Sequence, residues 1–251
     1  MKRYVGLLSE VKDITHKNQT DVDAYVQIAK KYNGKILELG SGSGHISLGL
    51  AQEGYHVTCL EIHRDMIHLH EEKLTDVTED NTTLVLGDMT SFELEESFDL
   101  IIAAQNVINA LKTKEDLLQM LSAVRKHLSD VGVFVVECDY PSIDLMKSIN
   151  EVERIELFEN PRSNMNIEHK VISKFNFDKM TRTDSIVVTE YIEKKIKRRI
   201  QVIKDFKIWT IDELEEIFKE ARLQLMLVSG SLSSIEPFAP DSEHMVFFLK
   251  V

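Results

Sequence analysis

Hydrophobic residues follow two patterns in the first half of the chain. Short apolar runs that end at glycine or an acid are typical of buried strands, and longer stretches with apolar residues three or four apart are typical of helices. The short runs predict strands at 35–40, 55–61, 83–87, 98–104 and 132–139. The longer stretches predict helices at 20–32, 44–53, 64–74 and 114–128. This alternation indicates a parallel sheet with helices on both faces.

The pattern changes after Pro141. Residues 142–158 predict one more helix, and a last helix at 211–221 has Thr210 as its expected N-cap. Alternating runs predict a small antiparallel sheet inserted before that last helix, and two strands after it that return to the core. The predicted inserted strands are 169–177, 185–192 and 199–209, and the returning strands are 223–229 and 244–250.

We therefore expect three parts along the chain. Residues 1–158 would form the main α/β core, which begins with the helix at 20–32. Residues 159–208 would form an antiparallel β insertion that covers the substrate, and residues 209–251 would complete the core sheet.

The stretch ILELGSGSG, residues 36–44, predicts a strand that enters a tight glycine turn before a helix. Glycines let a ligand approach the backbone, and the following helix N-terminus offers free N–H groups. The spacing is G-x-G-x-G from Gly40, with His45 where a dinucleotide site would have its third glycine. This spacing favours a small nucleoside ligand over a pyrophosphate.

Acids and polar residues follow the next strands. Glu61 ends the second strand, beside the glycine turn, where a carboxylate can accept both hydroxyls of a ribose. Asp88 follows the third strand and could accept an adenine amino group, while Met89 could lie on the base. The fourth strand leads into Gln105-Asn106. Ligands of such sheets bind beyond the carboxyl ends of the strands, where the strand order reverses, so cofactor and substrate should meet there.

These segments resemble the class I S-adenosylmethionine-dependent methyltransferases over about residues 20–140. ELGSGSG matches the first motif of that family, Glu61 its ribose acid, Asp88 its adenine contact and FDLIIAA its fourth strand. The C-terminal segments are similar to the small-molecule branch, which includes glycine and amino-sugar N-methyltransferases. The resemblance implies an α/β fold with a Rossmann-like seven-stranded sheet, helices on both faces, and S-adenosyl-L-methionine as cofactor. The implied cofactor-binding residues are Glu38, Gly40, Ser41, Gly42, Gly44, Glu61, Ile62, Met66, Gly87, Asp88, Met89, Ala104 and Gln105.

Methyl transfer from a sulfonium requires mainly that the protein hold the acceptor in line and exclude water. No acid–base pair is obligatory. The candidate catalytic residues are Gln105, Asn106 and Tyr140. Gln105 and Asn106, together with Asn109, could orient the acceptor, while Asp139 and Tyr140 could hold a polar or cationic group.

Other candidate residues have weaker support. Tyr4 and Tyr25 could belong to an N-terminal lid. Glu168 and His169 are adjacent on a predicted strand and should point to opposite faces, which argues against an acid–base pair. Cys138 has no clear histidine partner and fits a core position. A histidine-rich helix contains only one pair with i,i+4 spacing and no third ligand, so we expect no metal site. Its members are His63, His68, His70, Glu71 and Glu72.

Composition and charge narrow the functional class. The formal net charge is −12, whereas a protein that binds nucleic-acid phosphates normally presents a positive surface. One basic run, residues 194–199, could be an RNA patch, but it is more typical of a charged turn between two strands. No apolar run reaches the roughly 20 residues that span a bilayer, and the start of the chain lacks a signal peptide. Cys59 and Cys138 fall in predicted strands as buried thiols, which favours a reducing, cytoplasmic compartment.

Three hypotheses remain open from the sequence. The first is a methyltransferase for a small-molecule acceptor, most simply an amine nitrogen, that works as a monomer or homodimer without nucleic acid or membrane. The second is an RNA or protein methyltransferase that uses the basic run. The third is a protein that binds the cofactor without turnover, or a dehydrogenase with a nucleotide cofactor.

Overall fold

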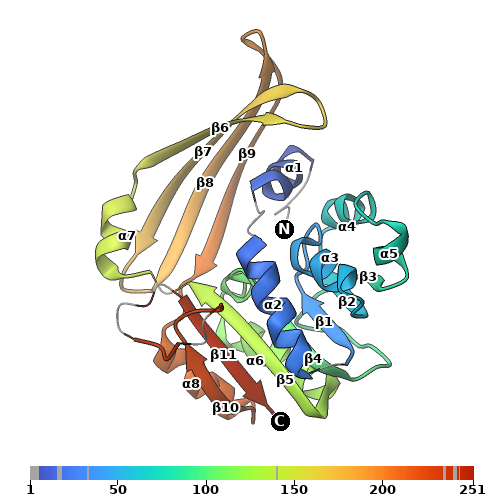
Figure 1. Ribbon diagram of the computed structural model, residues 1–251. Helices are drawn as coiled ribbons and strands as arrows, with labels where there is room; N and C mark the ends of the chain where they lie inside the picture. Colours follow the sequence, from blue (N-terminus) through green and yellow to red (C-terminus); the bar gives the residue numbers. More distant parts are fainter. Residues whose placement is uncertain are drawn as a thin grey trace.

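Two sheets organise the computed structural model, which describes residues 6–15, 19–32, 34–139, 141–233, 236–239, 242 and 244–251 (Figure 1). The helices are α1 (Leu7–Thr15), α2 (Gln19–Tyr32), α3 (His45–Gln52), α4 (Arg64–Glu71), α5 (Asp76–Glu79), the 3-10 helix η1 (Val107–Ala110), α6 (Lys114–His127), α7 (Ile143–Ile149) and α8 (Ile211–Glu220). The core strands are β1 (Ile36–Leu39), β2 (Val57–Glu61), β3 (Thr82–Leu86), β4 (Phe98–Ala103), β5 (Leu128–Asp139), β10 (Gln224–Ser229) and β11 (His244–Lys250). The inserted strands are β6 (Glu153–Asn160), β7 (Met165–Asn176), β8 (Thr181–Ile192) and β9 (Lys195–Lys207).

The core sheet has seven strands in the order β10-β11-β5-β4-β1-β2-β3. Strands β1 to β5 are parallel, and β11 runs antiparallel to both of its neighbours. The chain moves outward from β1 through β2 to β3 and then returns to place β4 beside β1. The strand order therefore reverses between β1 and β4, as the sequence predicts, and this point opens a crevice at their carboxyl ends.

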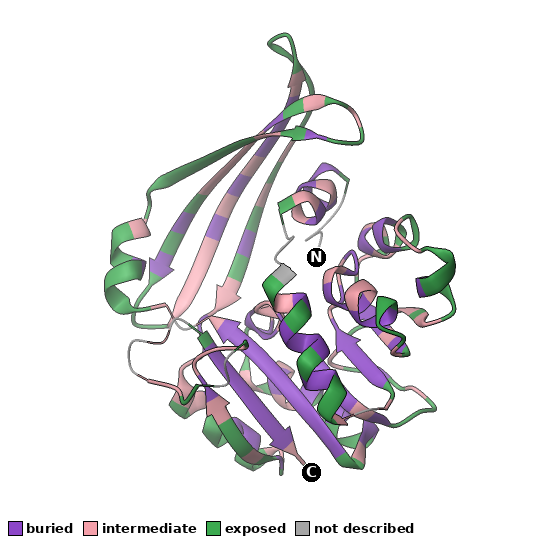
Figure 2. Cartoon of the chain, viewed as in Figure 1, coloured by how far each residue is buried: buried purple, intermediate pink, exposed green. Residues whose placement is uncertain are grey.

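Each face of this sheet has its own hydrophobic core (Figure 2). Leu37 and Ile101 pack with α6 and α8 on one face, whereas Ile36 and Leu100 pack with α2 and α3 on the other. Successive strand residues point to opposite faces, so burial on both sides requires the continuous apolar runs seen in the sequence. The predicted doubly covered α/β fold is confirmed.

The helix predicted for 142–158 is wrong beyond Ile149. Glu151 adopts φ 58°, a left-handed conformation that ends a helix, and Asn150 accepts a hydrogen bond from the backbone N–H of Phe175 at 2.9 Å. The following residues pair with β7 as an additional strand, β6. The helical spacing of Ile143, Met146 and Ile149 is real, but Val152, which continues it, lies beyond the end of α7 and is 47% exposed. The expected boundary between residues 158 and 159 lies inside β6.

The inserted sheet is antiparallel throughout, in the order β6-β7-β8-β9. Glu193 and Lys194 join β8 to β9 with φ 44° and 69°, the conformation of a tight two-residue hairpin. The prediction of a charged turn within the basic run is thus confirmed. In Figure 1 this hairpin forms the tip of the sheet that lies farthest from the core.

Helix α1, which the sequence analysis missed, lies between the inserted sheet and α4 (Figure 1). Its apolar residues Leu8 and Val11 pack against Ile167 and Ile186 of the inserted sheet. Its opposite side reaches the core, where Asp13 accepts a hydrogen bond from Ser43 at 2.6 Å. Helix α1 therefore connects the two sheets across the crevice. Within the described ranges no helix is long and apolar enough to cross a membrane.

Candidate active site

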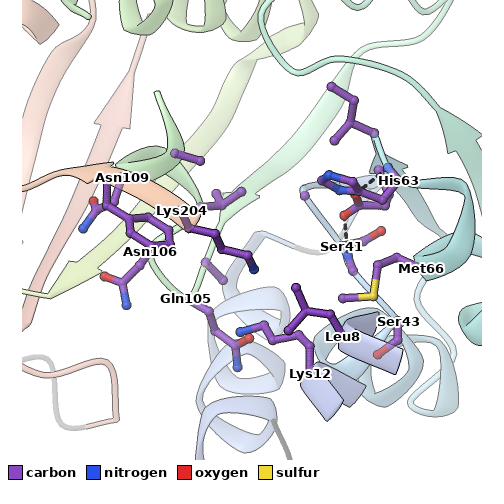
Figure 3. A pocket seen from close by; sticks show the side chains of 18 of the residues that line it. Leu8, Lys12, Ser41, Ser43, His63, Met66, Gln105, Asn106, Asn109 and Lys204 are labelled. Carbon is purple, nitrogen blue, oxygen red and sulfur yellow. Dashed lines mark hydrogen bonds and ion pairs between the residues drawn. The ribbon is translucent and has the colours of Figure 1, made fainter. Parts of the chain in front are cut away.

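A cavity of about 510 Å³ lies between the carboxyl edge of the core sheet, α1 and the inner face of the inserted sheet. The exits of β1, β2, β3 and β4 line one side of it. Strands β6 to β9 line the opposite side, and α1 contributes Leu8, Val11, Lys12 and Thr15 (Figure 3). Residues far apart in the sequence are thereby brought around one partly open cavity.

The glycine turn shapes the core side of this cavity. Gly40 and Gly42 have φ 71° and 58°, and a Cβ on Gly40 would lie 2.3 Å from a methyl group of Val107. Gly44 is different, because its N–H donates to the carbonyl of Ser41 at 3.0 Å and its Cα faces the ring of His70. Gly44 therefore shapes the turn from behind and does not line the cavity, unlike the other residues predicted for the cofactor.

Glu61 joins the end of β2 to this turn. Its Oε2 accepts a hydrogen bond from the N–H of Gly42 at 3.0 Å, and its Oε1 accepts one from the N–H of His63 at 2.8 Å. The Nδ1 of His63 lies 2.7 Å from the same Oε1. An ionised carboxylate offers about four acceptor positions, so Glu61 keeps capacity for hydroxyl groups of a ligand.

Three buried polar atoms, each on a residue that lines the cavity, have no hydrogen-bond partner among the described residues. They are Oε2 of Glu38, Oγ of Ser41 and Oδ1 of Asn109. Burial is the largest influence on Glu38 and raises its pKa to about 8. Buried polar groups normally find partners, so such atoms indicate a ligand with hydrogen-bond donors. The ammonium group of S-adenosylmethionine supplies donors of this kind, so Glu38 and Ser41, which lie at the glycine turn, fit that cofactor.

The remaining residues predicted for the cofactor surround the same core side. Asp88 is held by Thr90, whose N–H and hydroxyl donate to its Oδ1 at 2.9 and 2.7 Å. The second carboxylate oxygen of Asp88 remains available for a ligand. Apolar and backbone surfaces lie around it, as a nucleoside would require. The other lining residues of this group are Ile62, Met66, Gly87, Met89 and Ala104.

Gln105 and Asn106 leave β4 in a left-handed conformation, with φ 50° and 65°. Such conformations cost free energy and cluster at functional sites. The backbone N–H of Gln105 donates to Oε2 of Glu137 at 3.2 Å, and Oδ1 of Asn106 accepts a hydrogen bond from the N–H of Asp139. Both residues line the cavity together with Asn109 and Asp139. Tyr140, the third predicted catalytic residue, lies outside the described residues, as does Tyr4.

The expectation that Tyr25 belongs to a lid is wrong. Its side chain is fully buried within the core, and its hydroxyl donates to Oε2 of Glu137 at 3.0 Å. The same carboxylate oxygen accepts the N–H of Gln105. Tyr25 therefore has a structural role: its hydroxyl positions the Glu137 carboxylate, and this carboxylate binds the backbone N–H of Gln105 at the end of β4.

The histidines of the segment 63–72 lie in different environments and do not form a cluster. His63 pairs with Glu61, His68 lies exposed beside Glu72 at 3.3 Å, and His70 is buried beneath Gly44. Burial lowers the pKa of His70 to about 4.

His169 lines the cavity, but its partner is Glu156 on β6, at 2.9 Å, rather than Glu168. Cys138 is buried, and burial raises the pKa of its thiol.

Four cationic residues of the cavity wall were not predicted from the sequence. Lys12 on α1, Arg154 on β6, Arg182 on β8 and Lys204 on β9 all line the cavity. The guanidinium of Arg182 lies 4.6 Å from the ring centroid of Phe206. The spacing of Leu7, Leu8 and Val11 could have revealed α1, but no local signal indicates which face of an inserted strand meets the core.

Comparisons with known proteins agree with this geometry. Residues 36–132 match the profile of a methyltransferase-domain family. YqeM of Bacillus subtilis (strain 168), a provisionally named methyltransferase, is 23% identical over 97% of this chain and 95% of its own length.

Two solved structures share the whole fold. One is an S-adenosylmethionine-dependent methyltransferase from Clostridium acetobutylicum, with a TM-score of 0.78 at 15% identity, covering 97% of this chain and 95% of that one. The other is the sugar N-methyltransferase KedS8 from Streptoalloteichus, with a TM-score of 0.76 at 15% identity, covering 100% and 97%. Residues 36–132, which contain the glycine turn and Glu61, therefore match a methyltransferase-domain family, and the chain as a whole shares the Rossmann-like fold of these methyltransferase structures.

Proposed function

We propose that this enzyme transfers a methyl group to a small-molecule acceptor, and that the acceptor atom is an amine nitrogen. The proposal is carried by the partly covered cavity, because the inserted sheet and α1 cover the side of the core opposite the glycine turn. A cavity of about 510 Å³ accommodates small molecules rather than a folded macromolecule. The sugar N-methyltransferase KedS8, which shares the fold over its whole length, supports the choice of nitrogen.

In this proposal the core side holds the cofactor. The glycine turn takes the amino-acid part beside Glu38, Glu61 accepts the ribose hydroxyls, and Asp88 accepts the adenine amino group. S-adenosylmethionine, when bound, supplies a methyl group that is already activated as part of a sulfonium. The protein therefore contributes position and exclusion of water rather than a strong acid or base.

The acceptor side orients the amine. The amide side chains of Gln105, Asn106 and Asn109 line the cavity and offer neutral hydrogen bonds. These side chains would direct the lone pair of the neutral amine toward the methyl group that S-adenosylmethionine would supply, and the amine would lose its proton to solvent. In this proposal residues 159–208 cover the acceptor side of the cavity. Gln105 and Asn106, whose left-handed conformation follows β4, set the direction from which the amine approaches the methyl group.

The RNA alternative has less support. The basic run lies at the tip of the inserted sheet, far from the core in Figure 1. Its Arg198 forms ion pairs with Glu190 at 2.5 Å and Glu10 at 2.6 Å, so it fastens α1 to the sheet rather than presenting a free cation to phosphate.

The test is to incubate the enzyme with S-adenosylmethionine and a panel of small amines, and to measure S-adenosylhomocysteine and methylated product by mass spectrometry. Amine-dependent product is expected. Asn109→Ala should lower product formation while S-adenosylhomocysteine still binds, because Asn109 lies on the acceptor side. Turnover that requires RNA or protein would contradict the proposal, and so would cofactor binding without turnover on any amine.

A further inference from the structure

One histidine reaches the cavity from the inserted sheet. Among the described residues three histidines line the cavity, but His63 pairs with Glu61 and His45 begins α3 directly after the glycine turn. His169 belongs to β7, in the wall that faces these residues across the cavity. It therefore lies on the side where the acceptor is expected.

The alternation of β7 directs His169 inward. Ile167 and Val171, two positions to either side of it, belong to the hydrophobic cluster between this sheet and α1. Successive strand residues point to opposite faces, so the imidazole shares the inner face with them. Its neighbours Glu168 and Lys170 pair with each other at 3.4 Å on the outer face.

A carboxylate holds the ring of His169 in a defined state. Glu156 is its cross-strand partner on β6, and Oε2 of Glu156 lies 2.9 Å from Nδ1 of His169. An ionised carboxylate can only accept, so Nδ1 carries the proton and Nε2 keeps a lone pair. The ring makes no other hydrogen bond to the described residues, which leaves Nε2 for a ligand. A base oriented by a third group in this way is the arrangement used in proton transfer.

The pair also connects the cavity with solvent. The side chain of His169 is 16% exposed, whereas that of Glu156 is 64% exposed, and both residues line the cavity. A proton that Nε2 takes up inside the cavity can therefore be balanced by loss of the Nδ1 proton to Glu156 and then to water.

The acceptor gives this pair a task. An alkylamine, like the lysine side chain, is an ammonium ion near neutral pH and then has no lone pair for the methyl group. Two carboxylates of the same wall are paired with cations, Asp184 with Arg182 at 3.2 Å and Asp205 with Lys112 at 3.1 Å. An ion-paired carboxylate is a weak proton acceptor, whereas imidazole exchanges protons readily near neutral pH.

We propose that His169 is the general base that removes the proton from the acceptor ammonium before methyl transfer. The N–H bond of the ammonium breaks, its electron pair stays on nitrogen as the lone pair, and the proton passes to Nε2. The imidazolium then loses its Nδ1 proton to Glu156 and to water. This proposal rests on the proposed function and adds a catalytic residue to it.

The test compares two amines of nearly equal size, ethylamine and methoxyamine. Ethylamine is protonated near neutral pH and needs a base, whereas methoxyamine is already neutral. His169→Gln keeps a hydrogen-bonding side chain but cannot take up the proton, so kcat/KM for ethylamine should fall by roughly 100-fold or more. Its activity on methoxyamine should stay within a few-fold of the wild type. A larger alkylamine from the panel is compared in the same way with its own alkoxyamine analogue.

Two further variants keep the test independent of folding. Glu168→Gln changes the adjacent residue on the outer face and should leave both activities unchanged. Added imidazole should raise the ethylamine turnover of His169→Ala but not that of the wild type. S-adenosylhomocysteine affinity should be the same in all these proteins, because His169 faces the acceptor.

Equal losses on both amines in His169→Gln would show that the residue only shapes the cavity, and would overturn the proposal. Unchanged turnover of ethylamine in a folded His169→Gln protein would overturn it as well, while the proposed function would stand. A wild type that methylates no amine at all would instead contradict the proposed function, and the role of His169 with it.

Discussion

The imidazole Nδ1 of His63 lies 2.7 Å from Oε1 of Glu61, and the backbone N–H of His63 donates to the same oxygen at 2.8 Å. The other oxygen of Glu61 holds Gly42. One carboxylate therefore ties the end of β2 to the glycine turn, and the His63 ring occupies an acceptor position that a ribose hydroxyl would use. A ribose hydroxyl that binds Glu61 therefore competes with the His63 ring for this carboxylate.

This sharing gives opposite predictions for the two residues. Glu61→Ala should weaken S-adenosylhomocysteine binding by roughly 1–3 kcal/mol, because ribose hydroxyls lose a charged acceptor. His63→Ala keeps the backbone N–H and removes only the competing ring, so affinity should stay the same or rise. Calorimetry on both variants decides this. A 2′-deoxy analogue should bind more weakly than the parent to the wild type but not to Glu61→Ala. An unchanged affinity in a folded Glu61→Ala protein would exclude Glu61 as the ribose acceptor.

Proton release should accompany cofactor binding. The pKa of Glu38 is raised to about 8 by burial, so near pH 7 this group is largely protonated before the ligand arrives. The ammonium of the cofactor favours the carboxylate and should expel the proton. Calorimetry near pH 7 in two buffers of different ionisation enthalpy should give different heats for the wild type and equal heats for Glu38→Gln. Equal heats in the wild type would show that Glu38 does not face the ammonium.

The same shift has a consequence for stability. The ordinary pKa of a glutamate is 4.5, so the unfolded chain ionises at lower pH than the folded one. The contribution of Glu38 is full below pH 4.5 and is lost as pH rises through about 8. Glu38→Gln should therefore gain in Tm relative to the ligand-free wild type on going from acid to alkaline pH. A Tm difference between the two proteins that does not change with pH would count against the raised pKa.

Arg198 should fasten α1 to the inserted sheet. Its guanidinium bonds Glu190, whose side chain is 1% exposed, and Glu10 on α1. Arg198→Met leaves the buried Glu190 carboxylate without its cation and should cost roughly 2 kcal/mol of unfolding free energy. Arg199→Met, at the next exposed position, is the matched control. Thermal unfolding measures both, and equal Tm values for the two variants would show that the ion pairs contribute nothing.

The stabilisation that Arg198 provides should also depend on pH. The hydrogen bond from Arg198 is the largest influence on Glu190 and lowers its pKa to about 2. The stabilisation is therefore full above the ordinary pKa of 4.5 and is lost as pH falls toward about 2. The Tm difference between wild type and Arg198→Met should shrink in that acid range. A difference that grows on acidification would contradict the assignment.

The exposed cations of the hairpin should not matter for methyl transfer. Replacing Lys194, Lys195, Lys197 and Arg199 with serine removes most of the basic run and keeps the structural Arg198. Activity on a small amine should remain close to that of the wild type, and binding to a labelled RNA should be absent in both proteins. Salt-sensitive RNA binding that is lost in this variant together with its activity would favour the nucleic-acid alternative.

The core sheet and its glycine turn are predicted well from the sequence, because each is marked by residues that lie close together in the chain. Apolar runs mark the buried strands, and the glycine turn with Glu61 follows from the strand–helix order. The start of the inserted sheet is harder to predict, because Ile143, Met146 and Ile149 do lie in a helix and Val152 continues their spacing past its end. Nothing local in the sequence shows that Lys12 and Lys204 line one cavity, since they stand 192 positions apart and only the packing of α1 on the inserted sheet places both there.

The most direct test of the account is a crystal structure with S-adenosylhomocysteine. The account predicts that the ribose hydroxyls lie on Glu61, the adenine beside Asp88, and the sulfur toward the space between Gln105 and Lys204. A nucleoside bound elsewhere, or a sulfur directed away from the inserted sheet, would contradict the claim that cofactor and acceptor meet in this cavity.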